Sequence, residues 1–99
     1  MLNSRQRAQL RGLANSIDPI FQVGKSGPSE QIYKHINEAI ELRELVKITV
    51  LETSPVSARE CAEIIAANTG CDVVQVIGRK AVFYKQATEK ENRKIVLVK

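Results

Sequence analysis

The sequence has few aromatic, histidine and cysteine residues and no long apolar run. Its 99 residues include two Phe, two Tyr, no Trp, one His and two Cys. No apolar run exceeds four residues, whereas a membrane-spanning helix needs about twenty, so we expect no membrane segment. Residues 1–5 lead directly into a polar helical pattern without the apolar stretch of a secretory signal. We therefore expect a cytoplasmic protein.

The scarcity of reactive residues argues against an enzyme and against a metal site. Cys61 and Cys71 form no C-x-x-C pair and His35 is the single histidine, so we expect reduced thiols, no zinc and no cofactor. No nucleophile and base can be assembled into a catalytic set. Gly24-Lys25-Ser26 resembles the end of a P-loop, but Pro19 stands where that motif needs its first glycine.

The composition is typical of one soluble globular domain with an uneven charge distribution. Apolar residues make up 43% of the chain, charged residues 26%, and the net charge is +4. Residues 1–27 hold four basic residues against one acidic, residues 28–77 four against eight, and residues 78–99 seven against two. Basic ends around an acidic middle indicate an anionic partner, such as nucleic acid, if the two ends meet on one surface.

Apolar periodicity predicts the element order α-β-α-β-α-β-β. The expected elements are a helix capped by Ser4 and running to about Ser16, a strand over 20–23, a helix starting at Pro28, a strand over 45–51, a helix capped by Ser57 and ended by Gly70, and a hairpin of strands over 71–77 and 80–85. Crossover helices and a closing hairpin predict an α+β fold of two-layer type with a mixed four-stranded sheet. Residues 1–86 form the predicted domain, and 87–99 a charged tail that is either mobile or contributes a short final strand at 95–98.

The segment Gly24-Lys25-Ser26-Gly27 is the strongest candidate binding element. It lies between a predicted strand and a predicted helix start, where backbone N–H groups and the helix dipole favour an anion. Glycines let a phosphodiester approach the main chain, Lys25 adds a charge and Ser26 a donor. A plain turn that needs glycine for its backbone angles explains the same four residues equally well.

Further basic residues extend the candidate surface. Arg5, Arg7 and Arg11 cluster on the first helix and suit phosphate contacts, although a solvated helix face would look the same. Other candidates are Arg79 and Lys80 at the hairpin tip and Tyr84 and Lys85 beyond it. Tyr84 could stack on a base, while Phe21 and Phe83 are expected in the core.

The spacing of residues across most of the chain resembles the CRM domain of chloroplast RNA splicing and ribosome maturation proteins, and in particular its single-domain bacterial YhbY-like family. The matching residues are Leu10-Arg11-x-Leu13-Ala14, Pro19-Ile20-x-x-Val23-Gly24-Lys25-x-Gly27, Ile32, Ile36, Ala39, Ile40, Glu44-Leu45-Val46-Lys47, Val76-Ile77-Gly78-Arg79 and Tyr84-Lys85. Pro28 departs from the aliphatic residue expected there.

The resemblance, which covers about residues 2–86, implies a fold akin to the C-terminal domain of translation initiation factor three. It implies RNA binding without enzymatic activity, and association with precursors of the large ribosomal subunit. Gly24, Lys25 and Gly27 take the place of the family's G-x-x-G loop. Our leading hypothesis is therefore a monomeric factor that binds ribosomal RNA during large-subunit assembly.

Two other classes of function stay open on the residues alone. One is a dimeric DNA-binding architectural protein on a similar small scaffold. The other is a protein-interaction module that uses an exposed sheet edge at residues 95–98.

Overall fold

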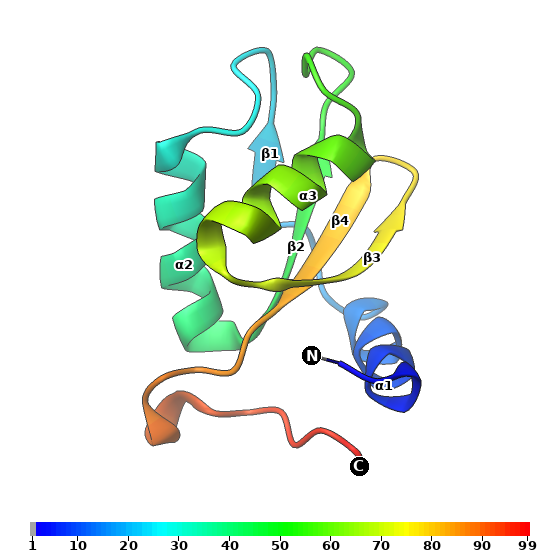
Figure 1. The fold of residues 1–99 in the computed structure, drawn as a ribbon, viewed down its shortest axis with the longest axis vertical. Helices are drawn as coiled ribbons and strands as arrows, with labels where there is room; N and C mark the ends of the chain where they lie inside the picture. The colour runs from blue at the N-terminus through cyan, green and yellow to red at the C-terminus, as the bar shows by residue number, and fades with distance from the viewer. Residues whose placement is uncertain (1) are drawn as a thin grey trace.

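The computed structural model describes residues 2–99 as three helices and one four-stranded sheet (Figure 1). The elements are α1 (Ser4–Ala14), β1 (Phe21–Val23), α2 (Glu30–Arg43), β2 (Leu45–Val50), α3 (Ala58–Thr69), β3 (Asp72–Ile77), β4 (Lys80–Tyr84) and a 3-10 turn, η1 (Lys90–Asn92). The predicted element order is confirmed.

The sheet is mixed, as predicted, and its register defines two ends of the molecule. The strand order is β1-β2-β4-β3, with β1 parallel to β2 and the other pairs antiparallel. Because Thr49 pairs with Lys80, the end of β2 and the start of β4 lie together. We call this the loop end, made of residues 24–29, 51–57 and 78–79. At the opposite, tail end, Leu45 pairs with Tyr84.

Side chains on the two faces of the sheet belong to two separate apolar clusters. On β4, Ala81 and Phe83 point to the cluster under α2 and α3, whereas Val82 and Tyr84 point to a second cluster. This alternation is the two-residue period of a strand buried on both faces. The second cluster packs against α1 and the C-terminal segment, so a third layer joins the two expected layers. Its other members are Leu2, Leu10, Ala14, Leu45 and Val74, with Ile17, Ile95 and Leu97 at its edge.

The first helix is capped one residue earlier than the sequence predicted. Asn3, rather than Ser4, is the N-cap, and its side chain accepts a hydrogen bond from the Gln6 amide. The Gln6 side chain in turn accepts from the Asn3 amide, which completes a capping box. Asparagine caps a helix as well as serine does, which explains the cap at Asn3. At its other end the helix stops at Ala14, short of the predicted Ser16.

The second helix, in contrast, starts later than predicted, while both predicted ends of the third are confirmed. Pro28 is not the first helical residue, because Ser29 is the N-cap and α2 begins at Glu30. Ser57 caps α3, and Gly70 ends it in the left-handed conformation, where glycine has no steric cost.

Glu44 joins the C-terminal segment to the sheet. It is fully buried, has a φ of 63° after α2, and its carboxylate accepts from the amides of Ala87 at 2.8 Å, Lys94 at 2.6 Å and Ile95 at 2.9 Å. Burial by itself would raise the pKa of Glu44, but the three amide donors and the nearby Arg93 hold it below its usual value. A carboxylate is thus stable in the interior because its charge is solvated by main-chain donors.

Glu41 binds the preceding part of the same segment. Its carboxylate accepts from the Thr88 hydroxyl, the Thr88 and Glu89 amides and the Asn92 side chain. The Thr88 hydroxyl and the amides lower the pKa of Glu41 to about 2. These bonds hold residues 88–92 against α2.

The last residues form neither a strand nor a loose tail. Over residues 95–98, all of which the structure describes, the chain is irregular and lies along α1. The Gln6 side chain donates to the Val98 carbonyl, and Gln9 donates to the Val96 carbonyl and accepts from the Val98 amide. The strand edge expected at 95–98 therefore does not form. The two basic ends of the sequence do meet, at the tail end (Figure 1).

Candidate nucleic-acid interface

The loop end brings together three segments that are far apart in the sequence. Because β1 and β2 are parallel, the chain leaves both strands on the same side (Figure 1). The Leu51 amide donates to the Val23 carbonyl at 2.8 Å, and the Val50 amide donates to the Arg79 carbonyl at 2.7 Å. The G-x-x-G segment, the start of the 51–57 loop and the hairpin turn are therefore neighbours, which the sequence alone did not establish.

Gly27 is required by the fold itself. Its amide donates to the Gly24 carbonyl at 2.9 Å. Its φ is +67°, a backbone conformation that residues other than glycine rarely adopt. A Cβ at this position would lie 3.1 Å from Cγ of Pro55. The turn interpretation therefore accounts fully for this glycine.

Gly24 is different, because neither its backbone nor its surroundings demand glycine. Its φ is not among the positive values. A Cβ would meet Cδ1 of Leu51 and Oγ1 of Thr53 at 3.6 Å, an ordinary van der Waals distance. The fold leaves the reason for glycine here open, and close approach of a ligand to the main chain is the physical alternative.

Lys25 and Ser26 form the exposed tip between the two glycines. Within residues 2–99 no carboxylate lies within 4.0 Å of the Lys25 ammonium, so its charge is available. Backbone N–H groups at this helix start were expected to serve an anion, but that of Gly27 is committed to the turn. The Ser29 side chain accepts a hydrogen bond from the Ile32 amide, and Glu30 places a negative charge in the first turn of α2. Both reduce the capacity of this helix start to bind an external anion.

Among residues 2–99, the hairpin tip offers one cation paired with a carboxylate and one without such a partner. Arg79 donates to the Glu52 carboxylate at 2.6 Å, and both side chains are largely exposed. An exposed ion pair of this kind is worth little and opens readily. Lys80 is exposed next to it, so the loop end offers Lys25 and Lys80 at once.

The three arginines of α1 lie at the tail end and not beside the loop. Arg5 and Arg11 are exposed. Arg7 is half-buried, and its guanidinium donates to the carbonyl of Val73 on β3. Arg7 therefore serves the fold, which leaves Arg5 and Arg11 as free cations of that cluster.

Tyr84 does not present its ring to solvent. It is only 5% exposed and belongs to the second apolar cluster, so the prediction that it stacks on a base is wrong for this structure. Burial, with Glu44 and Asp72 nearby, raises the pKa of Tyr84. Lys85 is exposed, and its ammonium donates to the Thr69 carbonyl at 3.4 Å.

The sequence analysis missed a second basic area, around a hollow at the tail end. Arg43, Lys47 and Lys94 come from α2, β2 and the C-terminal segment and line one hollow. They are distant in sequence and none belongs to a motif. The Glu44 contacts to the C-terminal segment, which have no sequence signature, help to bring Lys94 there.

The cysteines and acidic residues add no further site. Cys61 and Cys71 are buried free thiols, and burial raises the pKa of both. Among residues 2–99 no three His, Cys, Asp or Glu side chains are grouped so as to hold a metal ion. Over the same residues no helix is long and apolar enough to cross a bilayer.

Comparison with known proteins finds a domain family and relatives whose names describe them as RNA-binding. Residues 2–85 match the family model described as the CRS1 / YhbY (CRM) domain. A curated relative from Bacillus subtilis, named "Probable RNA-binding protein YqeI", is 40% identical over 98% of this chain and 99% of its own length. A Haemophilus influenzae relative named "RNA-binding protein" is 28% identical over 89% of each chain.

A solved structure shares the fold. The solution structure of SAV1595 from Staphylococcus aureus, a candidate RNA-binding protein, superposes with a TM-score of 0.78 at 40% sequence identity. The match covers 97% of this chain and 100% of that one. The fold likeness therefore covers nearly the whole chain and extends beyond the family match at residues 2–85.

Proposed function

The chain belongs to the CRS1/YhbY (CRM) domain family, and from this premise we propose that it is an RNA-binding protein. We propose further that its target is ribosomal RNA of large-subunit precursors, on which it acts in ribosome assembly without catalysis, in the cytoplasm and as a monomer. The names of two relatives support the first part. The resemblance to single-domain bacterial CRM proteins supports the second.

The loop end supports a phosphate-binding role for the G-x-x-G segment. The observation that carries the proposal is Gly24, a glycine that the fold does not require, next to the unpaired Lys25. A main chain without a Cβ and an adjacent ammonium suit a phosphodiester. Lys80 and, once its ion pair with Glu52 opens, Arg79 continue the positive surface.

Sedimentation of the tagged protein in cell extract tests the proposal. We expect the wild type to travel with large-subunit precursors in a sucrose gradient and Lys25→Glu to stay at the top. Lys90→Glu, on η1 and with the same change in net charge, is the matched control and should sediment like the wild type. A Lys25→Glu variant that still travels with the precursors would remove the loop from the mechanism.

A competition assay tests the choice of nucleic acid. The purified protein should prefer structured RNA to duplex DNA of equal length and should elute as a monomer. A stable dimer that prefers duplex DNA would instead favour an architectural DNA-binding protein.

A further inference from the structure

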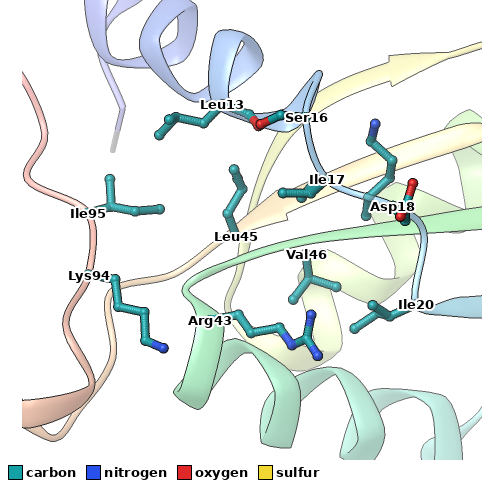
Figure 2. Close-up of a pocket in the computed structure, with 11 residues that line it drawn as sticks. Leu13, Ser16, Ile17, Asp18, Ile20, Arg43, Leu45, Val46, Lys94 and Ile95 are labelled. Atoms are coloured by element: carbon teal, nitrogen blue, oxygen red, sulfur yellow. The ribbon is translucent and has the colours of Figure 1, made fainter.

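A hollow of about 450 Å³ lies at the tail end, opposite the loop end (Figure 2). Its apolar lining is Leu13, Ile17, Ile20, Leu45, Val46 and Ile95. Figure 2 shows Leu13 of α1 above Leu45 of β2, with Ile95 of the C-terminal segment to the left of both. A hollow of this volume, with an apolar lining, is within the range of small-molecule sites.

The rim of the hollow is positively charged. The lining holds three basic residues, Arg43, Lys47 and Lys94, and one acidic residue, Asp18. Across residues 2–99 none of these three cations has a carboxylate within 4.0 Å. Unpaired cations around an apolar floor complement a ligand that is apolar in one part and anionic in another.

The hollow is held in shape by main-chain contacts. Lys94 and Ile95 form one wall because their amides both donate to the same carboxylate oxygen of buried Glu44, at 2.6 and 2.9 Å. Gln9 holds the next part of the segment on α1 through Val96 and Val98. The wall is therefore preorganised, which lowers the entropy cost of binding.

We propose that this hollow binds one unstacked nucleotide of a single-stranded RNA segment. The base lies against Leu13, Leu45 and Ile95, and its phosphate is bound by the rim cations. RNA is commonly recognised through splayed-out bases, which also stack on arginine planes such as that of Arg43. Exposed Arg11 on the neighbouring α1 extends the positive charge along the strand.

This inference rests on the proposed function and deepens it by adding a second contact. β2 has six residues, so the hollow lies roughly one strand length, about 17 Å, from the loop end. One RNA can therefore contact a phosphate site at the loop end and a base site at the tail end. Such a pair of contacts selects RNA by the position of an unpaired nucleotide.

Binding of a random-sequence single-stranded RNA of about 12 nucleotides to purified variants tests the inference. Leu13 is 41% exposed and Ile64, on the outer side of α3, is 37% exposed, so Leu13→Asp and Ile64→Asp are a matched pair. We expect Leu13→Asp to weaken binding about tenfold through loss of base contact, and Ile64→Asp to stay within about twofold. Lys47→Gln is a second variant in case Leu13→Asp does not fold.

Nuclear magnetic resonance with the wild type locates the contact. Adenosine and uridine 5′-monophosphate should shift the amide signals of Leu13, Lys47 and Ile95, and inorganic phosphate should not reproduce those shifts. One outcome would overturn this inference and leave the proposed function standing. In that outcome Leu13→Asp and Lys47→Gln bind RNA as well as Ile64→Asp does, while Lys25→Glu does not bind. A wild type that binds no RNA would overturn both.

Discussion

At the scale of single residues, two glycines of the same motif have different physical reasons. Gly27 adopts a positive φ and lies against Pro55, so the turn requires it. Gly24 has neither constraint. A G-x-x-G pattern in sequence cannot separate these cases, because both the backbone angle and the neighbour across the loop depend on the folded chain.

The two glycines should therefore respond differently to alanine. Gly27→Ala should lower the free energy of unfolding by about 1–2 kcal/mol, because a Cβ is strained at positive φ. Gly24→Ala should change the free energy of unfolding by no more than about 0.5 kcal/mol. It should weaken RNA binding about tenfold, because the added Cβ keeps the phosphodiester from the main chain and costs one hydrogen bond to a charged group.

Urea denaturation and a filter-binding assay on both variants measure these effects. Equal destabilisation by the two substitutions would show that Gly24 too is only a turn residue.

Glu44 is the residue on which the tail end depends. Glu44→Ala leaves the buried amide of Ala87 and the part-buried amides of Lys94 and Ile95 without an acceptor, so we expect a loss of about 2–4 kcal/mol in the free energy of unfolding. The backbone strain at this position is the same for alanine as for glutamate, which isolates the hydrogen bonds. Exposed Glu38→Ala on the same helix is the control, with an expected change within about 0.5 kcal/mol. Urea denaturation of both variants decides, and similar values for the two would contradict the role of Glu44.

At the scale of elements, we expect the C-terminal segment to be an acid-sensitive part of the fold. Glu41 and Glu44 both have a folded-state pKa below the ordinary 4.5. A lowered folded pKa contributes stability that is present above the unfolded pKa and lost as the pH falls through the folded one. The segment is therefore held at neutral pH and is weakened in acid.

We expect the amides of Thr88 and Glu89 to stay protected from hydrogen exchange at pH 7 and to lose protection as the pH falls from about 4.5 toward the Glu41 pKa of about 2. Glu41→Gln removes the titrating charge, so its Thr88 and Glu89 amides should show no such pH dependence in this window. If the wild-type amides lose protection with a midpoint at pH 4.5, the Glu41 carboxylate is not stabilised by these bonds.

The elements themselves were largely predictable, but their ends were less so. The apolar stripe of α2 and the Ser57 cap of α3 are local patterns, and the structure confirms both. Asn3 replaced the predicted cap Ser4, because asparagine and serine have comparable capping propensity. The second helix begins at Glu30 after the Ser29 cap and not at Pro28, a difference of two residues at a helix end. The segment after Tyr84 was unpredictable, because glutamates of α2 hold it through main-chain amides.

At the scale of the whole molecule, the cations that we assign to RNA contact are divided between two ends of the sheet. Lys25 and Lys80 lie at the loop end, and Arg5, Arg11, Arg43, Lys47 and Lys94 lie at the tail end. With Tyr84 buried, few exposed aromatic rings are available for stacking. RNA affinity should therefore come mainly from phosphate contacts.

The dependence of binding on salt tests this expectation. Contact with about four to six phosphates of single-stranded RNA predicts that the logarithm of the binding constant falls with the logarithm of salt concentration at a slope of about −3 to −4. Lys25→Gln should make the slope shallower by about 0.7, the share of one phosphate. Titrations between low and moderate salt give both values, and a slope near zero would contradict a phosphate-based mechanism.

The sequence by itself determined the element order, the mixed sheet and the position of the G-x-x-G segment, because periodicity, caps and glycines act over a few neighbouring residues. Only the tertiary structure decided which candidate cations meet, that Tyr84 and Arg7 serve the fold, and that residues 87–98 are packed. Those outcomes depend on sheet register and on contacts between residues far apart in the chain. A long-range hydrogen bond such as that from the Ile95 amide to Glu44 leaves no local pattern from which it could be predicted.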